Sequence, residues 1–144
     1  MSGRSGTQKR QRARRLGRAA EAIGALWLRL AGYRILARDF RVPVGEIDIV
    51  ALRGTTLAFI EVKARADASG TSAADEVLSL RQRRRIARAA ESFLKLHPHL
   101  ADRAIRFDLI VFGKNGEWCR AGWCPRTWFG WRPRHVTAAW RTDD

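Results

Sequence analysis

The sequence predicts an α/β fold in which helices flank a mixed central sheet. Residues 15–32 repeat apolar side chains at helical spacing. Residues 47–62 hold two β-branched runs around a glycine-containing break, which is typical of a β-hairpin. A second helical stretch and a near-continuous apolar run over 104–112 follow. The order helix, three strands, helix and one or more strands indicates a sheet with helices packed on it.

Composition bounds the class of partner. The chain has 144 residues, 28 of them Lys or Arg against 14 acidic residues, for a net charge of +14. This charge predicts a polyanionic partner, most simply nucleic acid. An anionic membrane surface is the competing interpretation, which the lack of basic residues between Glu21 and Trp27 disfavours. With no membrane span and no signal peptide, we expect a cytoplasmic protein.

Three regions are expected along the chain. Residues 1–14, with five basic and no acidic residues, predict a disordered basic arm. Residues 15–117 predict the α/β domain, and residues 118–144 a Trp/Arg-rich segment that packs on the domain or extends it. The Trp and Arg side chains of this segment would stack single-stranded bases, or the Trp would cover the end of the core. The second alternative is slightly favoured.

Each element has its own signals. The first helix, 15–32, is expected to bury Leu16, Ala20, Ile23, Trp27 and Leu30 and to end at Gly32. A strand over 33–41 and a connection over 42–45 follow, with Pro43 in the connection.

A flexible loop is expected over 65–76. Ser79 and Gln82 form a capping box for a helix that runs to about residue 97, with a buried stripe. The stripe comprises Ile86, Ala90, Phe93 and Leu94. After the strand over 104–112, residues 117–119 are expected to start a fifth strand, and Cys119 and Cys124 to be free thiols.

The hairpin over 45–63 is the most informative stretch. A turn centred on Gly54 and Thr55 places Asp48 directly across from Glu61. Lys63 then shares the face of Glu61, because side chains alternate along a strand. The same alternation assigns this face Glu46, Val50, Leu52, Leu57 and Phe59.

Two opposed carboxylates destabilise a sheet unless positive charge lies between them. Lys63 would supply part of that charge, and a divalent cation such as Mg²⁺ would supply more. Only four of the 28 basic residues are Lys. Because the pKa of Lys shifts readily while Arg stays protonated, a Lys at this position favours chemistry on a water molecule. A solvated face of mixed charges remains the alternative.

The second helix opens with five arginines, Arg81, Arg83, Arg84, Arg85 and Arg88. Basic residues at a helix N-terminus oppose the helix dipole, and bound phosphates would offset that cost. A solvated charged face is again the alternative.

Four stretches carry a family resemblance: 17–21 (Gly-Arg-Ala-Ala-Glu), 45–48 (Gly-Glu-Ile-Asp), 59–65 (Phe-Ile-Glu-Val-Lys-Ala-Arg) and 106–108 (Arg-Phe-Asp). Together they resemble the PD-(D/E)XK nuclease superfamily and, more closely, the bacterial YraN-type family, itself similar to archaeal Holliday-junction resolvases. Residues 135–140 are a weaker match to the family's closing segment. The resemblance implies a restriction-endonuclease-like αβββαβ core.

The resemblance also implies roles. Asp48 and Glu61, with the carbonyl of Val62, would bind Mg²⁺ or Mn²⁺, and Glu21 would help hold the metal or its water. Lys63 would orient or polarise the attacking water. The nucleic-acid backbone would be held by Arg65, Arg81, Arg84 and Arg85.

Two functions remain open at this point. One is a metal-dependent nuclease that hydrolyses phosphodiester bonds in DNA, branched or single-stranded. The other is a non-catalytic nucleic-acid-binding module with the same fold. The complete quartet Glu21, Asp48, Glu61 and Lys63 favours the nuclease. A junction resolvase would need two sites and hence a homodimer.

Overall fold

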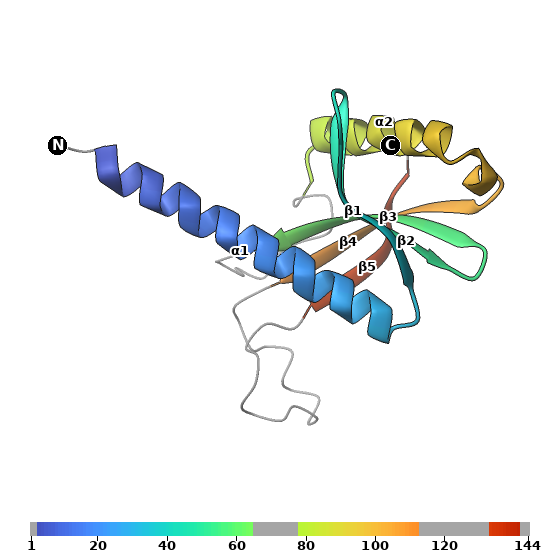
Figure 1. Ribbon diagram of the computed structural model, residues 1–144, viewed down its shortest axis with the longest axis horizontal. Helices are drawn as coiled ribbons and strands as arrows, with labels where there is room; N and C mark the ends of the chain where they lie inside the picture. Colours follow the sequence, from blue (N-terminus) through green and yellow to red (C-terminus); the bar gives the residue numbers. More distant parts are fainter. Residues whose placement is uncertain (1–2, 65–77, 113–132, 142–144) are drawn as a thin grey trace.

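A computed structural model describes residues 3–64, 78–112 and 133–141. Its elements are α1 (Gly3–Leu30), β1 (Arg34–Val42), β2 (Gly45–Arg53), β3 (Thr56–Ala64), α2 (Leu80–Leu96), the 3₁₀ turn η2 (Pro98–Leu100), β4 (Ala104–Phe112) and β5 (Pro133–Trp140) (Figure 1). The predicted α/β class and the order helix, three strands, helix, strands are confirmed, compatible with a restriction-endonuclease-like core.

The five strands form one mixed sheet in the order β1-β2-β3-β4-β5. β3 and β4 run parallel, and every other neighbouring pair is antiparallel. The crossover between β3 and β4 contains α2, whose Ile86 and Phe93 pack on Phe59 and Leu57. The core on the other face of the sheet lies under α1. The two helices therefore bury opposite faces of the sheet.

Helix α1 begins at Gly3, whereas the sequence predicted a disordered arm over residues 1–14. This stretch contains no proline and is rich in Arg, Gln and Lys, which are good helix formers. The helix can therefore continue from its packed part, and its N-terminal part extends beyond the sheet (Figure 1). In the part of the chain that the structure describes, no helix is long and apolar enough to cross a bilayer.

The predicted buried stripe of α1 is wrong in its second half. Trp27 is 43% exposed and Leu30 78% exposed. The buried face instead carries Ala20, Gly24, Ala25 and Leu28. A Cβ at Gly24 would lie 3.5 Å from Val62 and 3.6 Å from Ile110, so α1 packs close to the sheet through small residues. The large side chains, which the periodicity rule favours, are too bulky for this approach.

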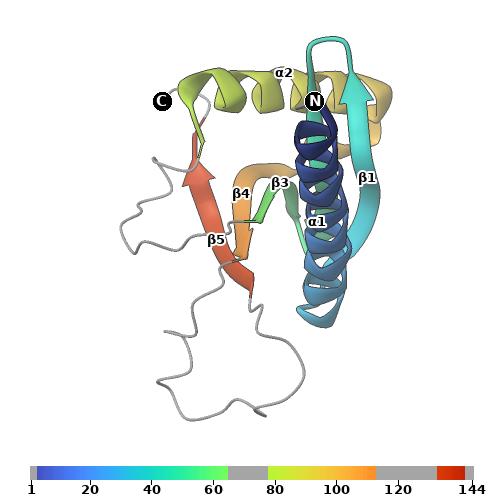
Figure 2. The same ribbon diagram turned by 90° about the vertical axis from the view of Figure 1, so that its left-hand side faces the viewer.

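The β1–β2 hairpin bends where Asp39 and Asp48 leave the ladder. The pairing runs from Arg38 with Ile49 directly to Phe40 with Ile47, and Asp39 has a positive φ of 51°. Beyond the bend, the hairpin stands upright beside α2 (Figures 1 and 2). There the ring of Phe40 meets that of Phe93 edge to face, with centroids 5.2 Å apart.

Gly45, the first residue of β2, packs directly on the backbone of α2. A Cβ at this position would overlap the carbonyl group of Arg85. Gly45 does not have a positive φ, so the glycine is needed for space and not for its conformational freedom. The close approach fixes the outer end of the hairpin on the N-terminal half of α2.

Several further predictions are confirmed. Ser79 caps α2, and its hydroxyl and backbone N–H both bond to Gln82 in a capping box. Gly32 follows α1 with a φ of 87°. The strand predicted over 104–112 is β4, paired on both sides. The loop 65–76, the strand start at 117–119, the two cysteines and Arg65 lie outside the described residues.

The sequence did not predict β5 as a strand. Residues 133–140 pair antiparallel with β4, and Pro133, which has no N–H to donate, stands at the strand's first position. Trp140 at its end is buried and stacks on Phe107, with ring centroids 5.5 Å apart. This Trp therefore covers the core and is not available to stack bases.

Candidate active site

The hairpin register around the site is the predicted one. β2 and β3 pair from Arg53 with Thr56 to Ile49 with Ile60, so the next two residues, Asp48 and Glu61, face each other at the end of the ladder. Here β2 turns away toward α2. The backbone N–H of Val62 instead donates to Oδ2 of Asp48 at 2.7 Å. The Asp48 side chain thus satisfies a donor that a regular ladder would have paired with backbone.

The protonation of Asp48 depends on its surroundings and on Glu61. Burial and the neighbouring Glu61 charge raise the pKa of Asp48 to about 8, although the hydrogen bond from Val62 works in the opposite direction. A hydrogen bond between the Asp48 and Glu61 side chains also favours the protonated form. This pair is therefore a place where a positive charge is electrostatically favoured.

Lys63 supplies one such charge. Its Nζ lies 2.9 Å from Oε1 of Glu61, and the two side chains are only 30% and 13% exposed. The predicted juxtaposition of Lys63 with Glu61 is thus present. Val50, Leu57 and Phe59 belong to the core under α2, so the apolar surroundings that the alternation predicted are also present.

Glu21 approaches the same group from α1. Burial, Asp39 and Glu61 raise its pKa, while Arg38 and Arg41 lower it. Glu21 in turn contributes to the raised pKa of Asp48. Three carboxyl groups from α1, β2 and β3 therefore interact electrostatically at one end of the hairpin.

Glu46 has a different partner. Its carboxylate is exposed and lies 4.0 Å from Nε of Arg41, which also pairs with Asp39 at 2.7 Å. These three residues form an exposed ion-pair group on the bent part of the hairpin. No described contact joins Glu46 to Asp48 or Glu61.

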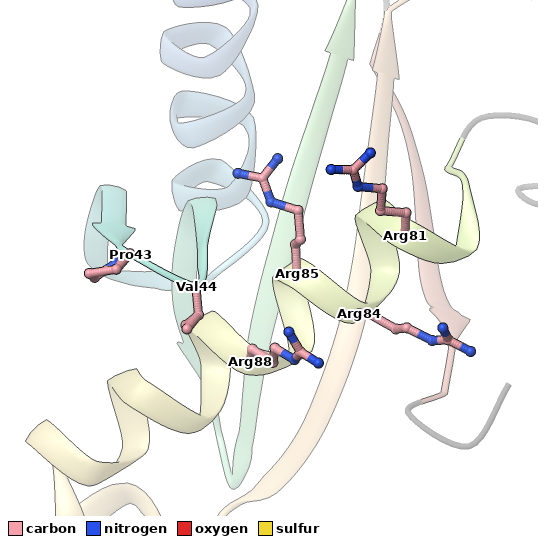
Figure 3. A pocket seen from close by; sticks show the side chains of 6 residues that line it. All are labelled: Pro43, Val44, Arg81, Arg84, Arg85 and Arg88. Atoms are coloured by element: carbon pink, nitrogen blue, oxygen red, sulfur yellow. The ribbon is translucent and has the colours of Figure 1, made fainter.

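The predicted phosphate contacts Arg81, Arg84 and Arg85 lie on an exposed face of α2. Together with Arg88 they form an arginine row, which lines a hollow of about 450 Å³ with Pro43 and Val44 of the β1–β2 turn (Figure 3). The sequence analysis counted Arg88 among the five basic residues that open this helix, but not among the backbone contacts that the family resemblance implies. Its spacing of three, four and seven residues from the other three was the available signal, because such residues share one helix face.

A second group that the sequence analysis missed is a buried network around Asp108. This side chain is fully buried and accepts hydrogen bonds from Arg106 at 2.8 and 2.9 Å and from the Ala138 N–H at 2.9 Å. Nε2 of His135 lies 2.8 Å from it, and Arg106 also donates to the Tyr33 hydroxyl at 2.7 Å. An acidic residue inside an apolar central strand was the signal that pointed to such a network.

The donors at Asp48 and Glu61 fit a hard divalent cation. Mg²⁺ takes one or two carboxylates and keeps several waters, so two carboxylates and a carbonyl suffice. Among the described residues, no group of three or more His, Cys, Asp or Glu side chains converges on one metal position. The predicted ligand Glu21 therefore does not converge with Asp48 and Glu61 on one position.

Comparison with protein families finds a match over most of the described core. The profile described as "Uncharacterised protein family UPF0102" matches residues 20–112, which include α2 and all four residues of the predicted quartet. The chain belongs to the UPF0102 family. This family, the YraN-type family of the sequence prediction, belongs to the PD-(D/E)XK nuclease superfamily.

Individual UPF0102 relatives extend the match over most of the chain. A UPF0102 protein of Parvibaculum lavamentivorans is 45% identical over 127 residues, which cover 88% of this chain and 82% of the relative. One of Paramagnetospirillum magneticum is 42% identical over 138 residues, covering 92% of each chain. One of Azorhizobium caulinodans is 48% identical over 109 residues, covering 76% of this chain and 81% of the relative.

Proposed function

We propose that the protein is a metal-dependent nuclease that hydrolyses phosphodiester bonds in DNA. The observation that carries this proposal is that Asp48 faces Glu61, which contacts Lys63, at the point where β2 leaves the ladder. Folding holds two acids close together in a partly buried place, at a cost in electrostatic free energy. A divalent cation and a phosphate would both gain from that arrangement.

Each residue of the site would have a role that follows from its chemistry. Asp48, Glu61 and the carbonyl of Val62 would hold Mg²⁺ or Mn²⁺, which when bound lowers the pKa of water and neutralises phosphate charge. Lys63, fixed by its contact with Glu61, would orient or polarise the attacking water through Nζ. Glu21 would accept a hydrogen bond from water on the α1 side. The arginine row would hold the DNA backbone through charge-assisted hydrogen bonds.

A non-catalytic nucleic-acid-binding module is the second candidate. The net charge of +14 and the arginine row favour this function as much as they favour the nuclease. Both functions predict an affinity that falls steeply with salt, because phosphate contacts release counterions. Binding alone therefore does not separate them, whereas the carboxylate pair beside Lys63 serves no purpose in simple binding.

A DNA cleavage assay distinguishes the nuclease from the binding module. Labelled branched, single-stranded and duplex DNA are incubated with Mg²⁺ or Mn²⁺ and with the wild type, Asp48→Ala or Lys63→Ala. A nuclease is expected to cut at least one substrate, with a rate lowered at least about 100-fold in either variant. Equal faint cleavage by all three proteins would indicate a contaminating enzyme and leave the binding module.

We also propose that the protein forms a homodimer, as cutting two strands of a junction would need two sites. Exposed apolar side chains on α1 support this: Leu26, Trp27 and Leu30 are 55, 43 and 78% exposed. Their spacing of one, three and four residues gathers them on one helix face. Sedimentation of the wild type as a dimer and of Trp27→Glu as a monomer is the expected result. A wild type that sediments as a monomer at high concentration contradicts the dimer.

A further inference from the structure

The turn between β1 and β2 is apolar, exposed and next to the arginine row. Val42 pairs with Gly45, so Pro43 and Val44 are the two turn residues. Both are exposed, Val44 by 44%. They form one wall of the hollow whose other wall is the arginine row (Figure 3). An apolar tip beside a strongly basic surface is unusual for a simple solvent-exposed turn, where Asn, Asp and Gly prevail.

The turn is held firmly in this place. Gly45 lies against the carbonyl of Arg85, and the edge-to-face contact of Phe40 with Phe93 anchors the other strand of the hairpin. Ile47 is buried in the core under α2. The tip therefore projects from a fixed support and keeps a constant position relative to Arg85 and Arg88.

The arginine row has the charge that a phosphate backbone needs. Its four residues are exposed and extend over about 10 Å along α2. Within the described residues, no ion pair joins any of the four to an acidic side chain. Their mutual repulsion and the helix dipole at this end both oppose folding unless an anion is bound. Spaced phosphates of one DNA strand supply such anions.

The turn also lies close to the proposed cutting site. Val44 precedes Asp48 by four residues, and a fully extended chain of that length spans at most about 14 Å. Because one strand rises about 3.4 Å per phosphate, this distance corresponds to roughly four nucleotides. DNA that touches the turn therefore has a phosphodiester bond within reach of Asp48 and Glu61.

We propose that the Pro43–Val44 turn is a wedge that enters DNA where a duplex gives way to single strands, while the arginine row holds the phosphates of the duplex. Apolar side chains such as Pro insert between base steps and unstack them, and the cost is smallest where a base pair already lies at an end. The position of the cut, within about four nucleotides of the junction, rests on the proposed nuclease function. The binding of the junction does not.

The experiment uses the full chain with Lys63→Ala, so that binding is measured without cleavage. The probe is a forked DNA with 2-aminopurine in the last base pair before the fork, compared with the fully paired duplex. The wedge is removed by Pro43→Asn with Val44→Gly, a pair that favours a two-residue hairpin turn and keeps the hairpin intact. Ile105→Ser is the matched control, because Ile105 is also an exposed β-branched residue (45%) but lies at the start of β4.

The expected result is fluorescence that rises on binding, with about tenfold tighter binding of the fork than of the duplex. The turn variant is expected to lose both the rise and the preference, whereas Ile105→Ser keeps both. A turn variant that unstacks the base and prefers the fork as strongly as its parent overturns the wedge. If the fluorescence results hold but the wild type cuts no DNA, the wedge stands and the proposed nuclease function fails.

Discussion

The backbone N–H of Val62 donates a 2.7 Å hydrogen bond to Oδ2 of Asp48, one residue beyond the last pair of the β2–β3 ladder. The bond anchors Oδ2 of Asp48, whose side chain also has a hydrogen bond with Glu61. The backbone of β3 therefore fixes the position of the Asp48 carboxyl group, but it does not balance the negative charges of Asp48 and Glu61. A bound cation would balance them.

The substitution Asp48→Asn tests whether a bound cation balances the charges of Asp48 and Glu61. The amide keeps an oxygen for the Val62 N–H but cannot carry the charge that a cation needs. Without divalent ions, we expect the variant to be as stable as the wild type at pH 8 or more stable, because a charge repelled by Glu61 is gone. With Mn²⁺ at about 100 times its Kd, the wild type should gain about 2.7 kcal/mol, or roughly 5–10 °C in Tm.

Thermal unfolding with a chelator and with Mn²⁺ measures both effects. Asp102→Asn is the control, because Asp102 is an exposed acid in the turn before β4. If Mn²⁺ raised the Tm of Asp48→Asn as much as that of the wild type, the ion would bind at another place.

Asp108 predicts a pH dependence of stability. Burial alone would raise its pKa, but hydrogen bonds from His135, Arg106 and the Ala138 N–H outweigh burial and lower it. A depressed folded-state pKa stabilises the protein above the unfolded pKa of about 3.9, and the stabilisation is lost as the pH falls through the folded value. Asp108→Asn should therefore cost about 3–5 kcal/mol at pH 7, since it leaves Arg106 partly buried without its charge partner.

Urea denaturation at pH 7, 5 and 3 measures this dependence. The difference in unfolding free energy between wild type and Asp108→Asn is expected to shrink as the pH falls from 5 to 3, where folded Asp108 begins to be protonated. A difference that grows between pH 5 and pH 3 would contradict the lowered pKa.

The sequence was most predictive where local chemistry decides the structure. Gly54 has the positive φ of 57° that the turn requires, and the resulting register brings Asp48 opposite Glu61. Ser79 and Gln82 cap α2 through bonds within one helical turn. These features depend on neighbours in sequence, so the pattern alone contained them.

Features that depend on packing were not predictable. Gly24 lies on the buried face of α1 and Trp27 outside it because the helix approaches Val62 and Ile110 closely, which periodicity does not encode. The bend at Asp39 also depends on tertiary structure, since it brings the hairpin onto α2. The pairing of Asp108 with His135 joins segments 27 residues apart in the chain.

Gly45 makes the contact between hairpin and α2 testable. A methyl group in Gly45→Ala would overlap the Arg85 carbonyl, and the forced displacement should cost at least about 1–3 kcal/mol. Gly17→Ala is the matched control, because no atom lies within 4 Å of its added Cβ and Gly17 is inside α1. That control should gain about 0.5–1 kcal/mol from helix propensity. Urea denaturation of both variants measures the difference, and a Gly45→Ala protein as stable as the wild type would refute the close contact.

If the arginine row holds DNA as proposed, the salt dependence of binding gives the number of phosphates that the row neutralises. Each Lys or Arg that contacts a phosphate of B-DNA contributes about 0.9 to the slope of log K against log salt. Arg84→Gln with Arg88→Gln is therefore expected to lower the slope by about 2, and to weaken binding similarly for all sequences. Arg103→Gln, an exposed arginine beyond the C-terminal end of α2, is expected to leave the slope unchanged. Fluorescence anisotropy with labelled duplex, over a series of salt concentrations, measures all three proteins. Equal slopes for the wild type and the double variant would place the duplex on another surface, since removing two charges from the path of the backbone must release fewer counterions.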